Sequence, residues 1–302
     1  MSHRPTLRRI WKMRHAYAFI APFFVLFLIF GAFPLVWSFI LTLKEWDGLR
    51  PMKSVGLRNY IVLLRDQRFL DAFGNTALYW AVNIVFILAL SLLMAGLLND
   101  QRLGGRQMYR LVLFLPNVTA TVAVGLVFKM VFDYNSGLIN GILGSMRLPI
   151  LPWLNSTGLS KIPVMVLSIW RDTPWYMLIM ISGLQTISPE LHQAATVDGA
   201  NRLQRLLHVT IPGLAPVLFF CFLTLTIDSF RIFTEPYIMT GGGPGSSSLS
   251  IVQYLYESGF TLFKLGYASS IAYVLTFILL IVSAAQVFVF RKRGSVVGGK
   301  AA

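Results

Sequence analysis

Six long apolar stretches constrain what this chain can fold into more than any other feature of the sequence. A helix needs roughly 20 predominantly apolar residues to cross the hydrocarbon core of a bilayer. Six stretches reach that length, at residues 16–43, 75–98, 109–132, 163–187, 211–233 and 267–290. Hydrophobic residues make up 56% of the 302 residues and charged residues only 13%, which is outside the usual range of soluble domains. The sequence therefore predicts an all-α integral membrane protein with six transmembrane helices.

The basic residues predict how these spans are oriented. If the N-terminus is cytoplasmic, the two tails and the second and fourth loops carry 14 Lys and Arg residues, counting Arg110 at the inner end of the third stretch, and the outer loops carry nine. Cytoplasmic segments are enriched in Lys and Arg, so both termini are expected in the cytoplasm. The first apolar stretch is too long for a secretory signal peptide and predicts an uncleaved helix. The chain then divides into a basic tail at 1–15, a six-span domain at 16–290 and a second tail at 291–302.

Several other classes of protein are excluded by the composition. The net charge of +14 would suggest nucleic-acid binding in a soluble protein, but here the basic residues cluster at the ends of apolar stretches. The single cysteine, Cys221, and four scattered histidines provide no metal site. The glycines of 241–245 are not followed by a phosphate-binding lysine, and the match at Gly294, Gly299 and Lys300 lacks its Ser or Thr. We therefore expect no nucleic-acid partner, no cofactor on this chain and no enzymatic activity.

The loop between the fourth and fifth spans carries the signals of a helix start. Ser188 can cap a helix, Pro189 suits the first helical position, and Glu190 places a negative charge near the positive helix end. Gly199 marks a turn, after which apolar residues recur at helical spacing until Pro212. The pattern predicts a small helix-turn-helix on the cytoplasmic face, whose small residues allow a partner's surface to approach closely. An ordinary amphipathic surface helix is the alternative interpretation.

The same loop contains the motif Gln193-Ala194-Ala195-x-x-Asp198-Gly199-Ala200, which ends in Ile211-Pro212. This motif resembles the Glu-Ala-Ala loop in the permease subunits of binding-protein-dependent type I ABC importers. In that family the loop docks the ATPase subunit. The resemblance therefore implies a coupling role for Gln193, Ala194, Ala195, Asp198, Gly199, Ala200 and Pro212. Gln193 stands where the family commonly has Glu, and this removes one negative charge from the loop.

Three further motifs extend the resemblance over roughly residues 56–290. They are Gly56-Leu57-Arg58-Asn59-Tyr60, Thr240 to Gly245, and Leu265-Gly266-Tyr267-Ala268-Ser269. They are similar to the carbohydrate-uptake branch, of the maltose and glycerol-phosphate type, with a core permease region at 75–290. The resemblance implies an importer of a sugar or sugar-like solute in a bacterial or archaeal cytoplasmic membrane. Besides the lipid bilayer, the implied partners are a second homologous permease in a heterodimer, two ATPase subunits that bind ATP and magnesium, and an extracytoplasmic solute-binding protein.

Charged side chains within the spans mark a second candidate site. Each costs about 2.5–3.5 kcal/mol on insertion scales, so Arg171, Asp172 and Asp228 need polar partners or water. Adjacent helical residues point about 100° apart, so Arg171 and Asp172 are not expected to pair with each other. Aromatic faces nearby are suited to stacking on sugar rings. The candidate solute pathway comprises Asn117, Trp170, Arg171, Asp172, Trp175, Tyr176 and Asp228. Structural bonding between helices is the alternative role for these residues.

Two other functions are open to a membrane protein with several spans. A secondary active transporter of a small polar solute would normally show repeated halves and paired interrupted helices, and the sequence shows no such symmetry. A membrane enzyme would need a nucleophile with its base, or a metal cluster, and the sequence offers neither. The secondary transporter is kept as the alternative function.

Overall fold

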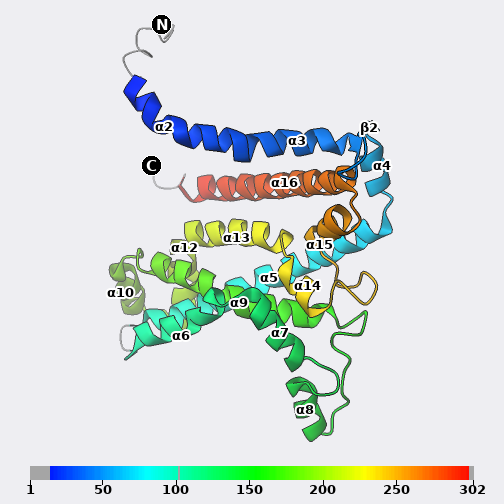
Figure 1. Cartoon of the computed structure of the whole chain (residues 1–302). Coiled ribbons are helices and arrows are strands. Elements are labelled where there is room, and N and C mark those ends of the chain that lie inside the picture. Colours follow the sequence, from blue (N-terminus) through cyan, green and yellow to red (C-terminus); the bar gives the residue numbers. More distant parts are fainter. Residues whose placement is uncertain (1–13, 101–102, 299–302) are drawn as a thin grey trace. The chain divides into compact units, whose positions relative to one another are not determined.

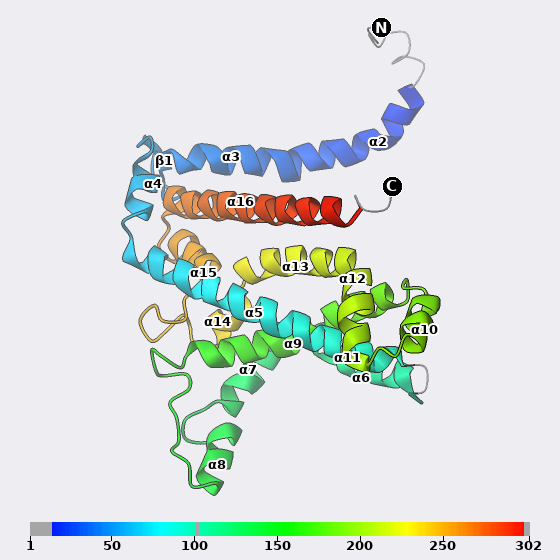
Figure 2. The same cartoon turned by 180° about the vertical axis from the view of Figure 1, so that it is seen from behind.

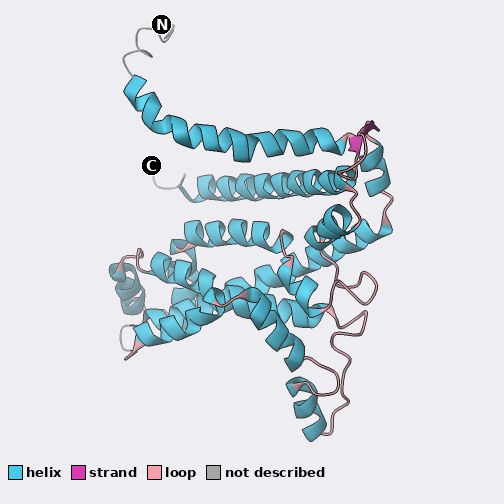
Figure 3. Ribbon diagram, viewed as in Figure 1, coloured by secondary structure: helices cyan, strands magenta, loops and turns pink. Residues whose placement is uncertain are grey.

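The structure is a computed structural model that describes residues 14–100 and 103–298. The chain divides into two compact units, which are described separately: the first is Met1–Leu63 with Glu257–Tyr273, and the second is Leu64–Tyr256 with Val274–Ala302. Figure 1 labels the elements, Figure 2 shows them from behind, and Figure 3 shows that nearly all of them are helices. Most of the predicted N-terminal tail and the end of the predicted C-terminal tail lie outside the described residues.

The first unit contains the first apolar stretch as one almost continuous helical segment. Its elements are α2 (Arg14–Phe27), η1 (Leu28–Ala32), α3 (Phe33–Thr42), β1 (Lys44–Glu45), β2 (Lys53–Ser54), α4 (Arg58–Leu63), η3 (Glu257–Thr261) and the start of α16 (Leu265–Gly298). β1 and β2 pair antiparallel. The side-chain amide of Asn59 donates to the backbone carbonyls of Thr42, at 2.8 Å, and Lys44, at 2.9 Å. A Cβ at Gly266 would lie 1.9 Å from the carbonyl oxygen of Lys44, so this approach requires glycine.

The second unit contains the remaining apolar stretches and the predicted helix-turn-helix. In chain order its elements are α5 (Gln67–Asn99), α6 (Arg106–Val118), α7 (Thr121–Val131), α8 (Leu138–Ser145), α9 (Lys161–Leu184), α10 (Pro189–Val197), α11 (Arg202–Arg205), η2 (Leu206–Thr210), α12 (Ile211–Gly213), α13 (Ala215–Phe230), α14 (Thr234–Met239) and α15 (Ile251–Tyr256), followed by the rest of α16. α5, α9 and α13 contact one another and form its centre.

The core between these three helices combines close packing with hydrogen bonds between helices. Tyr176 and Met177 of α9 are buried. A Cβ at Gly183 would lie 2.9 Å from the Val217 side chain, so glycine here lets α13 approach α9 closely, as small residues do in membrane helix pairs. The Ser91 hydroxyl donates to the Thr173 carbonyl at 2.8 Å. This packing fixes the relative positions of the helices that carry the candidate pathway residues.

The predicted spans coincide with helices, but not all of these helices are equally apolar. Among the described residues, four helical segments are long and apolar enough to cross a membrane: Tyr17–Thr42, Gln67–Asn99, Ala215–Met239 and Leu265–Lys292. A fifth results if α6 and α7 count as one span, although they are bent by 91°. α9 covers the predicted fourth span as a helix of 24 residues and carries Lys161, Arg171 and Asp172. The described residues therefore contain four or five candidate spans, and six transmembrane helices stay a prediction.

A bend of 91° between α6 and α7 interrupts the third predicted span, at 109–132. α6 contains Pro116, whose ring lacks the backbone N–H that a continuous helix needs. Thr119 and Ala120 then adopt ψ angles of 147° and 115°, far from helical values. The Thr119 hydroxyl donates to the Pro116 carbonyl at 2.8 Å, which satisfies one backbone oxygen freed at the break.

Candidate functional site

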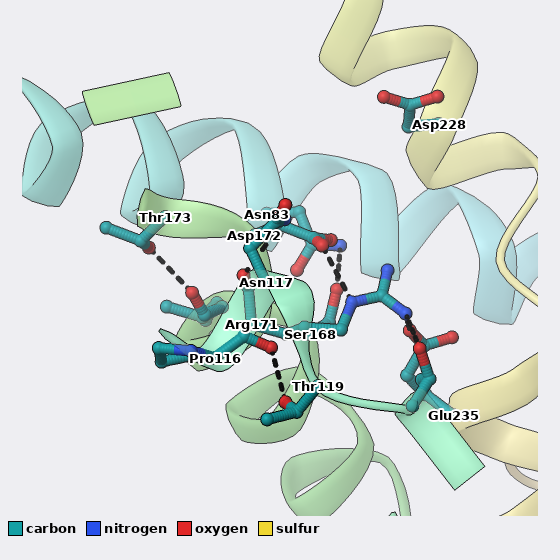
Figure 4. Close-up of polar contacts among 12 residues, drawn as sticks. Asn83, Pro116, Asn117, Thr119, Ser168, Arg171, Asp172, Thr173, Asp228 and Glu235 are labelled. Atoms are coloured by element: carbon teal, nitrogen blue, oxygen red, sulfur yellow. Dashed lines mark hydrogen bonds and ion pairs between the residues drawn. The ribbon is translucent and has the colours of Figure 1, made fainter. Parts of the chain in front are cut away.

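A polar cavity of about 570 Å³ lies among the helices of the second unit. It gathers side chains from α5, α6, α9, α13 and α14, several of which Figure 4 shows. The lining comprises Asn83, Asn117, Ser168, Arg171, Asp172, Trp175, Tyr176, Asp228, Ser229, Arg231, Ile232, Phe233, Thr234 and Glu235. Most of these side chains are polar or charged, although the helices that carry them are largely apolar. A cavity of this size is within the range that holds small ligands.

Arg171 holds together three elements around this cavity. Its Nη1 lies 2.5 Å from Oε1 of Glu235 on α14, and the same nitrogen donates to the Thr121 hydroxyl on α7 at 3.1 Å. Its Nε donates to Oδ1 of Asp172 at 2.8 Å. Figure 4 shows the guanidinium between the two carboxylates. The single cation thus partly balances two acidic groups, which offsets much of the cost of burying them.

The contact between Arg171 and Asp172 corrects one prediction. Their Cα–Cβ bonds diverge along the helix as expected, but the arginine side chain is long enough to turn back toward its neighbour. Arg171 also bonds to another helix, since it forms an ion pair with Glu235 of α14.

Asp228 occupies another part of the lining. One of its carboxylate oxygens accepts a hydrogen bond from the Tyr176 hydroxyl at 3.0 Å, which links α13 to α9. Figure 4 shows Asp228 apart from the guanidinium of Arg171. Asn117 donates to the backbone carbonyl of Arg171 at 3.5 Å. The cavity therefore contains the ion-paired cluster of Arg171, Asp172 and Glu235. It also contains the carboxylate of Asp228, which accepts a hydrogen bond from the Tyr176 hydroxyl.

Six of the seven pathway residues predicted from sequence line this cavity, and Trp170 does not. The Trp170 ring instead lies 5.3 Å, centroid to centroid, from that of Phe128. Trp175 does line the cavity and is 49% exposed. Glu235 was missed because it lies two residues beyond the predicted end of the fifth span. Its one sequence signal is a lone acidic residue at the edge of an apolar stretch.

The loop at 188–212 adopts the predicted helix-turn-helix. The Ser188 hydroxyl caps α10 by accepting from the Glu190 N–H at 3.3 Å. Gly199 has φ of 78°, and the next N–H, that of Ala200, donates to the Ala195 carbonyl at 2.9 Å, closing the helix end. α11 begins with a capping box between Asn201 and Gln204. Pro212 lies in α12, immediately before α13.

The outer surface of this helix-turn-helix is uncovered within the described part of the chain. Gln193, Ala194, Asp198 and Gly199 are exposed, and no heavy atom lies within 4 Å of a Cβ built on Gly199. Apolar side chains are exposed beside them, namely Leu191 at 56%, Val197 at 88% and Leu203 at 63%. Exposed apolar groups around an open turn suit contact with another protein.

Comparisons with known proteins show which family this chain resembles. A family model described as the inner membrane component of binding-protein-dependent transport systems matches residues 3–293. The chain belongs to this family. The permease is 32% identical to the arabinooligosaccharides transport system permease protein AraP of Bacillus subtilis, over 90% of this chain and 87% of the relative. It is 30% identical to the lactose transport system permease protein LacF of Rhizobium radiobacter, over 96% of this chain and 98% of the relative.

A solved structure shares the fold of the permease. A chain in the crystal structure of a bacterial ABC transporter involved in the import of the acidic polysaccharide alginate superposes with a TM-score of 0.83. It is 19% identical, and the match covers 96% of the permease and 99% of that chain. The permease is thus a non-catalytic inner membrane component of an ABC transport system. This family assignment decides against the secondary active transporter.

Proposed function

We propose that this permease forms, with a second homologous permease, the pathway by which an ATP-driven importer moves a sugar or sugar-like solute across the cytoplasmic membrane. The observation that carries the proposal is the polar cavity enclosed by largely apolar helices. The names of its relatives point to the same class of solute, since these are permeases of transport systems for arabinooligosaccharides, lactose, and trehalose and maltose.

The lining offers the groups that a sugar requires. The carboxylate of Asp228 accepts one hydrogen bond from Tyr176 and has further lone pairs for solute hydroxyls. The Asn117 amide can both donate and accept, and the half-exposed Trp175 ring offers an apolar face for a sugar ring. Arg171 is engaged by Glu235 and Asp172 and acts mainly as a positioning residue.

The helix-turn-helix gives the permease its coupling element in this proposal. The ATPase subunit binds the open turn around Gly199 and the exposed residues Gln193 and Ala194. ATP and magnesium bind to the two ATPase subunits, and an extracytoplasmic solute-binding protein delivers the solute at the opposite face. The chain crosses the membrane six times, and both termini lie in the cytoplasm. The excess of Lys and Arg in the predicted inner segments supports this orientation.

A saccharide screen followed by uptake assays tests the proposed pathway. The solute-binding protein is screened for saccharides that it retains, and uptake of the best one is measured in proteoliposomes that contain the assembled transporter. Asp228→Asn removes the charge from the acceptor and should lower uptake about tenfold or more, since hydrogen bonds to charged groups contribute about 1.5–3 kcal/mol. Asp133→Asn, in a turn outside the cavity, is the matched control. Equal uptake by the two variants would remove Asp228 from the pathway.

A further inference from the structure

A second cavity, of about 1210 Å³, lies beside the helix-turn-helix and shares no lining residue with the first. Its walls come from the C-terminal half of α5, the end of α9, and the segment from α10 to η2. All of these elements belong to the second unit. The cavity has no role in the proposed solute pathway, and its chemistry differs between its two ends.

One wall of this cavity is a strip of apolar and small residues along α5. It consists of Ala89, Leu92, Leu93, Gly96 and Leu97, whose spacing places them on one face of the helix. Leu93 is 61% exposed and Leu97 65% exposed. No heavy atom lies within 4 Å of a Cβ built on Gly96. Within the described part of the chain, Leu93, Gly96 and Leu97 are exposed, whereas Leu92 packs partly against the core. α5 is apolar and long enough to cross a membrane.

The other end of the cavity is basic. Arg106, Arg202 and Arg205 line it together with His192, against a single acidic residue, Asp100. Arg205 donates from Nη1 to the Thr196 hydroxyl at 2.9 Å. Its buried Nε has no hydrogen-bond partner among the described residues. The basic side chains outnumber the acidic one at this end of the cavity, so the site favours an anionic group.

We infer that this cavity binds an anionic phospholipid, with its phosphate among the arginines and an acyl chain along the α5 strip. Basic pockets between membrane helices bind lipid headgroups of this charge. The strip lies on a membrane-spanning helix and the arginines lie where that helix ends, so the two ends of the cavity match the chain and headgroup levels of a bilayer. Two other occupants fit the cavity less well. A soluble anion has no acyl chain to pack against the leucines, and a partner helix that packs closely against α5 does not need three arginines beside it.

The test counts the lipids that remain bound to the assembled transporter. Transporter from nanodiscs of mixed phosphatidylglycerol and phosphatidylcholine is analysed by native mass spectrometry. Phosphatidylglycerol should be retained in preference to phosphatidylcholine. Arg106→Gln with Arg202→Gln should weaken its binding about thirtyfold, about fivefold for each charge removed. Gly96→Leu should also reduce retention, because its side chain fills the strip but leaves every arginine in place. Arg65→Gln, at the opposite end of α5, should change nothing.

Three results would overturn the inference. Equal retention of the two lipids by the wild-type transporter would show that the arginines do not bind the anionic headgroup in preference to the zwitterionic one. Displacement of phosphatidylglycerol by inorganic phosphate, with no effect of Gly96→Leu, would show an anion site without an acyl chain. Cross-linking of the Leu93→Cys variant to another subunit in the assembled transporter would show that a protein covers the strip.

Discussion

At the scale of single residues, the pathway cavity is organised by one arginine between two carboxylates. Removing one member of a buried charge cluster usually costs more than its attraction contributed, because the remaining charges lose their compensation. Glu235 is only 3% exposed in its side chain, so water compensates it little. The stability of this region should therefore depend on matched charges rather than on any single group.

Replacing Arg171 tests this dependence. Arg171→Met leaves Glu235 and Asp172 without their cation and should destabilise the fold by about 3 kcal/mol. The double variant Arg171→Met with Glu235→Gln should recover part of that loss, because one uncompensated charge is gone. Thermal unfolding in detergent measures the loss of stability in Arg171→Met, in Glu235→Gln and in the double variant. A double variant whose loss equals the sum of the two single losses would show that the residues do not interact.

Residue types were easier to predict than residue partners. Arg171, Asp172 and Asp228 stood out because charges are rare in apolar spans. The ion pair to Glu235 could not be predicted, since it depends on how α14 folds back onto α9. The contact between Arg171 and Asp172 escaped prediction because Cα–Cβ directions say little about where a long arginine side chain ends.

At the scale of elements, the helix-turn-helix was predictable because each of its signals is local. Ser188, Pro189 and Gly199 specify a start and an end without reference to the rest of the chain. The break between α6 and α7 was less predictable. Pro116 signals a kink, but a bend of 91° also depends on neighbouring helices that accommodate the extended backbone after it.

Substituting Gly199 tests the coupling role of this element. Gly199→Asp should leave expression in the membrane largely intact, because the side chain points into open space and the positive φ costs only about 1–2 kcal/mol. The charged side chain should clash with the ATPase surface, so uptake is lost and less ATPase co-purifies. Gln193→Glu should be tolerated.

Gly104→Asp is the matched control for this substitution, since it places the same charge in the other loop that is predicted to face the cytoplasm, again in open space. Wild-type uptake and ATPase retention in Gly199→Asp would mean that the turn does not couple the subunits. Equal losses in both variants would point to a general effect of charge on this face.

At the scale of the whole molecule, the apolar stretches alone predict most of the helices, because a membrane leaves few alternatives for a backbone that must satisfy its own hydrogen bonds. The sequence alone does not fix the number of crossings. α9 carries three charged residues, so we expect its insertion as a span to depend on the polar cavity that it lines.

Labelling of single cysteines tests the six-span topology. In a Cys221→Ser background, Gly245→Cys should react with an impermeant reagent added from outside, since residues 241–245 follow the fifth predicted span. Val197→Cys, which replaces an 88% exposed side chain in the coupling loop, should react only from the cytoplasmic side. Labelling of position 245 solely from the cytoplasm would contradict the topology.

ATP hydrolysis and solute uptake, measured together in the same proteoliposomes, test most directly whether this chain is the permease of an ATP-driven importer. The permease alone should hydrolyse no ATP. With the second permease, the ATPase subunits and the loaded solute-binding protein, hydrolysis should rise and solute should accumulate inside the vesicles. Omission of ATP, or of the binding protein, should stop accumulation. Accumulation driven by an ion gradient in the absence of ATP would contradict the importer and support a secondary transporter.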